Sequence, residues 1–268
     1  MESVIDDKLY QEEWLKKSHD AFRNAPGYPH IVIDNFLKED VANTLYENFP
    51  SSQEMRKSYK NLNENKSEGS GFDQYHPLFT RLREELGTDQ FKAAFSKLTG
   101  IDNLILPNDH RGTGVHQGFD GSYLDVHVDF SIHPTLKLHR RLNLLIFLNK
   151  NWKEEYGGHC EFWDADVKNL VGQALPSFNR AVIFECSRIS YHGYSKINIP
   201  EDESRKSFYT YFYTEVEEGV KYHDTIFKAR PNEGTAKKIK TDVKEKSKNF
   251  VKRALYKLNL KRLFNKFE

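Results

Sequence analysis

The sequence predicts an α+β fold with a mainly β core, in which a small antiparallel sandwich or closed barrel is fronted by helices. Between about residues 123 and 214, short β-branched and aromatic runs alternate with turn signals such as Gly157-Gly158. No helix longer than a turn or two fits that stretch. Helical patterns precede it and a basic, polar tail follows it, so the β-rich stretch forms the core.

The first hundred residues predict helices and one strand that support this core. Apolar spacing indicates a helix over 9–22, stopped by Pro26-Gly27, and an apolar run indicates a buried strand at 30–33. Residues 51–74 are polar and rich in Ser, Asn, Lys and Gly, which predicts a surface loop. Further helices are expected at about 39–48, ended by Pro50, and twice within 75–98.

Turn signals divide the β-rich stretch into six expected strands. The Gly-rich segments 111–114 and 118–121 predict loops just before the first of them. We expect a support region integral to the fold at 1–100, the core at 101–216 and a basic, partly helical tail at 217–268. The strands are predicted at about 123–129, 140–148, 159–163, 181–186, 190–192 and 205–214.

Charge and composition exclude several classes of protein. Lys and Arg number 40 against 39 Asp and Glu, so no overall positive field indicates a nucleic-acid partner. Cys160 and Cys186 are too few for a disulfide framework and lack the spacing of a zinc module. The N-terminus has no apolar signal region, and no segment approaches the ~18 apolar residues of a membrane span. A soluble, cytoplasmic protein is therefore expected.

One predicted strand carries two possible metal ligands. Side chains alternate along a strand with period two, so His127 and Asp129 lie on the same face. His192, at the end of a later strand, supplies a second imidazole, and Gly193 beside it lets the backbone approach closely. Two imidazoles and one carboxylate form the facial triad of non-haem iron(II) oxygenases, which leaves three coordination positions open. Chance spacing among eleven histidines is the competing interpretation.

Arg205 strengthens the interpretation as a metal site. It opens the aromatic segment 205–214, thirteen residues after His192. An arginine that points inward from such a strand needs an anion, and its planar fork fits a carboxylate through two parallel hydrogen bonds. Lys206 faces the opposite side and is the alternative if the register differs.

The ordered motifs resemble the prolyl-4-hydroxylase-like branch of the 2-oxoglutarate/iron(II) dioxygenases. That family pattern runs His-x-Asp, a strand ending in Leu-Asn, Gly-Gly before another strand, His-Gly, and Arg opening an aromatic strand. The resemblance covers residues 28 to 215 and includes a similar first strand at 29–37. The matching pieces, in order, are His127-Val128-Asp129, segment 141–149, Gly157-Gly158, His192-Gly193 and Arg205-Lys206-Ser207.

The resemblance implies a double-stranded β-helix, the jelly-roll or cupin-like barrel, with Fe(2+) at one mouth and 2-oxoglutarate deeper inside. It also implies that O2 and 2-oxoglutarate are consumed to hydroxylate an organic substrate, with succinate and CO2 as co-products and L-ascorbate as a possible reductant. His127, Asp129 and His192 carry over as the catalytic metal ligands, and Arg205 as the anchor of the distal carboxylate of 2-oxoglutarate.

Three further residues are expected to bind 2-oxoglutarate. Alternation places Asn143 and Phe147 on the face that lines the co-substrate pocket in the family. Many relatives have Tyr where Phe147 stands, so one hydroxyl contact is missing, and Tyr123 could replace it. Relatives that hydroxylate proline often use Lys as the anchor, so Arg205 weakens the transfer of a collagen-type substrate.

Two other functions fit the same residues. A catalytically silent barrel could bind carbohydrate or peptide, since one fold hosts many functions, and a zinc hydrolase could use the same three ligands. The sequence leaves the substrate open among peptidyl proline, a free amino acid, a sugar and another small metabolite.

The basic C-terminal segment 244–267 favours either peripheral membrane contact or docking to a protein partner or to the chain itself. Its apolar residues fall on two opposite faces of a helix, so the helix either breaks near Asn259 or is held between two surfaces. The first face carries Val251, Ala254, Leu255 and Leu258, and the second carries Leu260, Leu263, Phe264 and Phe267.

Overall fold

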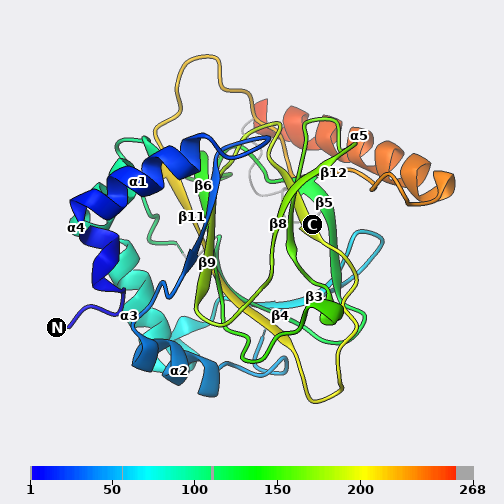
Figure 1. The fold of residues 1–268 in the computed structure, drawn as a ribbon. Helices are drawn as coiled ribbons and strands as arrows, with labels where there is room; N and C mark the ends of the chain where they lie inside the picture. Colours follow the sequence, from blue (N-terminus) through cyan, green and yellow to red (C-terminus); the bar gives the residue numbers. More distant parts are fainter. Residues whose placement is uncertain (1, 56, 110–111, 258–268) are drawn as a thin grey trace.

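The computed structural model describes residues 2–55, 57–109 and 112–257, and its core is a nearly closed barrel of antiparallel strands (Figure 1). The order of neighbouring strands is β1-β9-β6-β11-β4-β3-β5-β10-β7-β8, with β2 beside β3 and β12 beside β5. This arrangement confirms the predicted fold class. The strands are β1 His30–Asp34, β2 Lys57–Lys60, β3 Glu64–Gly69, β4 Thr113–Gly118, β5 Tyr123–Val128, β6 His139–Phe147, β7 Cys160–Trp163, β8 Leu170–Ala174, β9 Arg180–Glu185, β10 Tyr191–Tyr194, β11 Arg205–Thr214 and β12 Ile226–Phe227.

Helices cover the half of the sheet that contains β1, β6, β9 and β11, and a separate helix lies near β5 and β12 on the opposite side (Figure 1). Helices α1 to α4 therefore form one layer against the barrel. The helices are α1 Glu12–Arg23, α2 Glu39–Glu47, α3 Pro77–Leu86, α4 Asp89–Thr99 and α5 Thr235–Lys257, with short 3-10 turns η1 Asp7–Tyr10, η2 Phe72–Gln74 and η3 Glu154–Tyr156.

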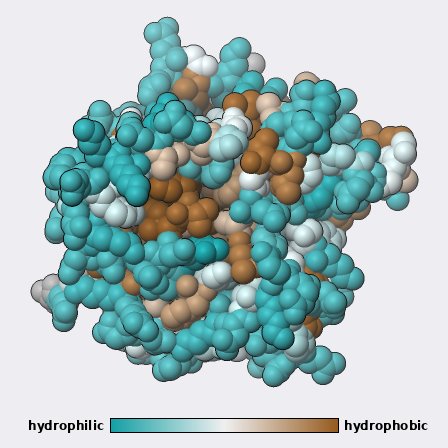
Figure 2. Space-filling view, in the orientation of Figure 1, coloured by the Kyte–Doolittle hydropathy of each residue, from teal (hydrophilic) through white to brown (hydrophobic). Residues whose placement is uncertain are grey.

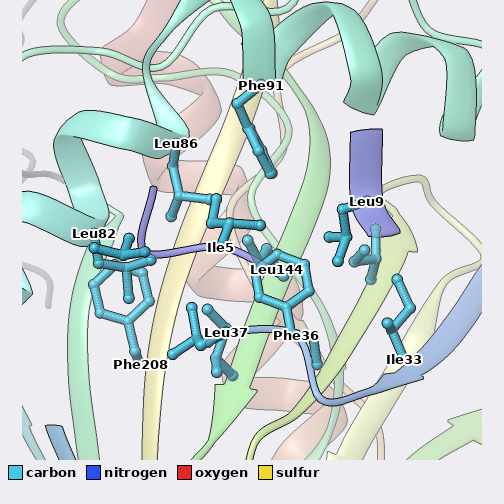
Figure 3. Close-up of a cluster of buried hydrophobic side chains, with 14 of the residues drawn as sticks. Ile5, Leu9, Ile33, Phe36, Leu37, Leu82, Leu86, Phe91, Leu144 and Phe208 are labelled. Atoms are coloured by element: carbon cyan, nitrogen blue, oxygen red, sulfur yellow. The ribbon is translucent and has the colours of Figure 1, made fainter. Parts of the chain in front are cut away.

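The main hydrophobic core lies between the helical layer and the outer face of the sheet. Alternation along β6 and β11 turns Leu144 and Phe208 outward, where both are fully buried. Leu86 of α3 and Phe91 of α4 point toward these strands from the other side (Figure 3). Burial of this apolar surface stabilises the pairing of layers, and the opposite face of the same strands is left for the barrel interior.

Residues 51–74 were predicted as a surface loop, and the structure corrects this prediction. β2 and β3 form an antiparallel hairpin there, followed by η2. β3 pairs with both β4 and β5, so it joins the two halves of the barrel. Backbone hydrogen bonds rather than apolar side chains hold this hairpin, which explains why hydrophobic periodicity does not reveal it.

The Gly-rich segments predicted as loops before residue 123 are corrected in part: β4 spans Thr113–Gly118, whereas residues 119–122 form the predicted loop between β4 and β5. A Cβ atom at Gly114 would lie 2.5 Å from the Gly69 carbonyl oxygen, and one at Gly118 would lie 2.4 Å from Ser122 Oγ. These glycines therefore allow close strand packing. β8, for which no strand was predicted, forms the edge next to β7.

The C-terminal segment is built into the body of the protein. β12 pairs with β5, and the buried side chains of α5 form a polar row. Of the expected first apolar face, Leu255 is half-buried against Ile132 and Tyr222. Ala254 is exposed, and the predictions from Leu258 onward lie outside the described residues. Within residues 2–55, 57–109 and 112–257, no helix is long and apolar enough to cross a membrane. The buried row on α5 is Thr241, Glu245, Asn249 and Lys252.

Candidate metal and co-substrate site

Two neighbouring strands bring the three predicted metal ligands together. β5 and β10 are antiparallel, and His192 lies directly opposite His127 in their register. The Asp129 carboxylate lies 3.6 Å from His127 Nε2 and 3.7 Å from His192 Nε2. The ligand atoms of all three residues lie within 4.8 Å of one another, and both histidines are buried.

Backbone carbonyls orient both imidazoles. His127 Nδ1 lies 2.9 Å from the Asp125 carbonyl oxygen, and His192 Nδ1 lies 3.0 Å from that of Ser190. A carbonyl oxygen can only accept, so Nδ1 of each neutral ring donates and Nε2 keeps its lone pair. Both Nε2 atoms face Asp129, which is the arrangement of metal-binding histidines whose second nitrogen is held by a carbonyl group.

Asp129 is held as a carboxylate. Arg140 Nη1 lies 2.9 Å from its Oδ1, and Asn143 Nδ2 donates to its Oδ2 over 3.2 Å. Burial disfavours its ionisation, but Arg140 and the two histidines outweigh burial and keep the pKa of Asp129 well below its usual range. Burial lowers the pKa of His192 to about 4, with a smaller contribution from His127. At neutral pH the His192 imidazole is therefore neutral and the Asp129 carboxylate is ionised.

Arg140 is a functional residue that the sequence analysis missed. Its guanidinium carbon lies 3.6 Å from the ring centre of Phe130 and 3.5 Å from that of Tyr211, and its side chain is fully buried. An irregularity where β6 pairs with β11 places Arg140 opposite Tyr213 and Leu142 opposite Phe212. The extra residue on β6 reverses the alternation, so Arg140 points into the barrel beside Asp129.

This donor set fits iron(II). Two neutral imidazoles and one carboxylate on converging strands can occupy one face of an octahedral ion and leave three positions for other ligands. Each of the three side chains is also held in its orientation by a neighbouring group. Backbone carbonyl oxygens hold the two histidines, and Arg140 and Asn143 hold Asp129.

Arg205 lies at the start of β11 and points into the barrel. Its Nε donates to the Gly158 carbonyl oxygen over 2.8 Å, and its guanidinium carbon lies 4.2 Å from the ring centre of Tyr194 and 4.8 Å from that of Phe147. Burial lowers the pKa of Arg205. Among the described residues, no carboxylate lies within ion-pair distance of it, so this buried cation is available for an external anion.

Two small residues give space and a further polar group beside Arg205. A Cβ at Gly158 would lie 3.2 Å from Arg205 Cδ and 2.6 Å from Ile197 Cγ2, so only glycine leaves this room. Ser207 shares the inward face of β11 with Arg205, and its buried Oγ has no hydrogen-bond partner among the described residues. A dicarboxylate bound to Arg205 can accept from this hydroxyl.

The structure places the three predicted co-substrate residues differently. Phe147 lies next to Arg205, whereas Asn143 donates a hydrogen bond to the Asp129 carboxylate. The Tyr123 hydroxyl donates to the Asn61 carbonyl oxygen over 2.7 Å, away from the triad. A bulge explains this position: β10 residues 192 and 194 pair with β5 residues 127 and 124, so an extra residue of β5 reverses the alternation before His127.

The C-terminal segment directly contacts β5, the strand that carries His127. Phe227 of β12 lies opposite His127, with ring centres 5.2 Å apart. The buried carboxylate of Asp125 lies 3.4 Å from Arg230 Nη1 and 2.9 Å from Lys237 Nζ, and Arg230 Nε also donates to Glu161. The Asp125 carbonyl oxygen accepts a hydrogen bond from His127 Nδ1. The charged network around the Asp125 side chain therefore fixes the residue that orients the His127 imidazole.

Comparison with known proteins agrees with this site. A family model described as "2OG-Fe(II) oxygenase superfamily" matches residues 113–213, which contain the triad and Arg205. The mouse protein "Prolyl 3-hydroxylase OGFOD1" is 26% identical over 215 residues. That alignment covers 77% of this chain and 37% of the mouse protein, so the chain spans a little over a third of that relative.

Solved structures share the fold at low sequence identity. A Pseudomonas putida prolyl-4-hydroxylase superposes with a TM-score of 0.54 at 14% identity and covers 75% of this chain and 99% of its own. A Trichoplax adhaerens prolyl hydroxylase, solved with a hypoxia inducible factor peptide fragment, gives 0.55 at 18% identity and covers 78% and 96%. The chain therefore shares its barrel fold with these two prolyl hydroxylases.

Proposed function

We propose that this chain, whose residues 113–213 match the model of the 2OG-Fe(II) oxygenase superfamily, is a 2-oxoglutarate-dependent oxygenase that hydroxylates a prolyl residue of a peptide. 2-Oxoglutarate and O2 are the co-substrates: one oxygen atom enters succinate as CO2 leaves, and the other becomes the hydroxyl group of the product. The observation that carries this proposal is the convergence of His127, Asp129 and His192 in the same barrel as the unpaired Arg205.

The residues of this chain divide the work of binding. Iron(II), when bound by the triad, supplies activation of O2. Arg205 would hold the distal carboxylate of 2-oxoglutarate through charge-assisted hydrogen bonds, with the Phe147 ring beside it. Arg140 and Asn143 fix the Asp129 carboxylate, so its oxygen atoms stay oriented toward the metal position.

The choice of a peptidyl prolyl substrate rests on the relatives and on the open approach to the site. The mouse relative is a prolyl 3-hydroxylase, and the Trichoplax protein was solved with a peptide. A cavity of about 490 Å³ lies beside Asp129, which has room for a side chain and part of its backbone. L-Ascorbate as a reductant belongs to this proposal.

A zinc hydrolase is disfavoured by Arg205. Hydrolysis at a metal with three protein ligands uses a bound water and gives no role to a buried, unpaired arginine on the inner face of β11. An oxygenase that binds a dicarboxylate explains both features.

The test is succinate formation by the iron-loaded protein, with and without proline-containing peptides, together with mass spectrometry of the peptide. We expect a proline peptide to gain one oxygen atom and to raise succinate formation. His127→Ala should abolish both signals, whereas His159→Ala, a control at a histidine paired with Glu154, should retain them. Succinate formation that never exceeds the peptide-free rate with any proline peptide would contradict a prolyl substrate.

A further inference from the structure

The cavity beside Asp129 is strongly charged. Two rim loops form part of it: residues 186–188 precede β10, and residues 217–223 precede β12. Figure 2 shows hydrophobic side chains gathered in hollows near the centre of the face it draws, within a mainly hydrophilic surround. The charged lining consists of Asp129, Arg140, Arg141, Glu185, Arg188, Glu217 and Lys221.

The acidic residues of this cavity are already paired. Asp129 faces Arg140, and Arg141 lies 3.6 Å from Glu185 and 3.2 Å from Glu217. Glu185 is shared with Arg23, at 3.1 Å, which lies outside the cavity lining. The carboxylates near the metal position are therefore neutralised within the protein.

Two cations of the rim remain unpaired. Arg188 and Lys221 are exposed, and no carboxylate of the described residues lies within ion-pair distance of either. Burial lowers the pKa of the neighbouring His223. The hydrogen bond to the Asp224 carbonyl oxygen acts in the opposite direction, and the positive charges of Arg188, Arg253 and Arg140 lower the pKa further. Among the residues that line the cavity, four cations therefore stand against three carboxylates.

The loops that carry these two cations are fixed next to the metal ligands. Ser131, two residues after Asp129, receives a hydrogen bond from the His223 backbone N–H over 2.9 Å and donates to the Lys221 carbonyl oxygen over 3.2 Å. Ser190, two residues before His192, accepts from the Ser187 N–H over 2.8 Å. The backbone segments that carry the exposed side chains of Arg188 and Lys221 are therefore anchored close to Asp129 and His192.

We propose that Arg188 and Lys221 form a subsite for a carboxylate side chain of the substrate, so that the enzyme selects peptides with Asp or Glu close to the oxidised residue. This inference rests on the proposed peptide substrate and names its chemical class. The exposed cations attract acidic peptides and repel basic ones, and the paired Glu185 and Glu217 do not cancel this preference.

The experiment measures binding of fluorescent proline peptides to the protein loaded with iron(II) and 2-oxoglutarate under argon. The three peptides carry Asp, Ala or Lys on both sides of the proline. We expect the Asp peptide to bind about five- to tenfold more tightly than the Ala peptide and the Lys peptide to bind most weakly. The difference should shrink as salt is raised, because exposed charges are screened.

Charge reversal tests the assignment without depending on loss of function. The double variant Arg188→Glu/Lys221→Glu should prefer the Lys peptide, which misfolding cannot produce. The matched control Lys16→Glu/Lys17→Glu, on the exposed face of α1, should keep the wild-type preference. Equal affinity of the wild type for all three peptides, or an unchanged order in the reversed variant, would overturn the subsite.

Turnover separates this inference from the proposed function. If the Asp peptide binds best but no peptide is hydroxylated, the carboxylate subsite stands and the prolyl substrate falls. If peptides are hydroxylated but bind without regard to charge, the prolyl substrate stands and the subsite falls.

Discussion

The N-terminal helical layer and the C-terminal segment both pack against the barrel, but by opposite chemistry. The N-terminal layer buries apolar side chains such as Leu86 and Phe91 against the outer face of the sheet (Figure 3). The C-terminal segment instead packs charged groups against the sheet, where Arg230 and Lys237 contact Asp125 of β5. Apolar packing gives stability without direction, whereas a charged network fixes the orientation of particular groups. We infer that the first region stabilises the fold and the second also tunes the metal site.

The largest effect is expected in the N-terminal layer. Phe91→Ala removes a ring packed against Phe95 and Phe212 and should lower the free energy of unfolding by about 3–5 kcal/mol. Urea denaturation measures this change. Iron affinity of the folded variant should match wild type, because α4 lies on the outer side of the sheet. The control Val32→Ala, at a side chain 38% exposed, should change stability little.

A smaller loss of stability with an effect on iron is expected for Arg230→Met. Asp125 keeps Lys237 and Asn63, and Glu161 keeps the Trp163 N–H, so we expect a loss of about 2 kcal/mol rather than the full cost of an unpaired buried charge. Iron affinity should fall about tenfold, because Arg230 helps to fix Asp125, whose carbonyl oxygen orients His127. Lys240→Met, at an exposed position of α5, is the matched control. Unchanged iron affinity in Arg230→Met would remove the distinction between the two regions.

The smallest effect is expected at a helix end in the N-terminal layer. The Thr88 hydroxyl accepts a hydrogen bond from the Phe91 N–H over 3.2 Å and so caps α4. Thr88→Ala should lower the free energy of unfolding by about 1 kcal/mol, with no change in iron affinity. Calorimetric titration with iron(II) beside thermal unfolding checks both parts, and weaker iron binding would show that the helical layer also tunes the site.

The same contrast explains how much the sequence could predict. The apolar periodicity of α2 and the β-branched runs of β5, β6 and β11 predict those elements to within a residue, since both patterns report burial against the core. α1 begins at Glu12, three residues after its predicted start, and α3 and α4 were predicted only as two helices within 75–98. β4 was missed because its glycines serve close packing. The packing of α5 was missed because its buried face is polar, which hydrophobic periodicity cannot detect.

The site divides along a different physical line. His127, Asp129, His192 and Arg205 were predicted from strand parity and ligand chemistry, and the structure brings the first three together. Tyr123 and Arg140 lie beyond bulges, one in β5 and one in β6. A single extra residue reverses the alternation, so Tyr123 points away from the site and Arg140 points into it, and strand parity cannot predict either.

The most direct test is an anaerobic titration of iron(II) in the presence of 2-oxoglutarate, followed by visible absorption. His127, Asp129 and His192 should produce a weak charge-transfer band that saturates at one iron per chain. The band should be absent in His127→Ala, and Arg205→Ala should need a much higher concentration of 2-oxoglutarate to produce it. A band of equal strength in His127→Ala, or none in the wild type at saturating iron and 2-oxoglutarate, would contradict iron binding by this triad.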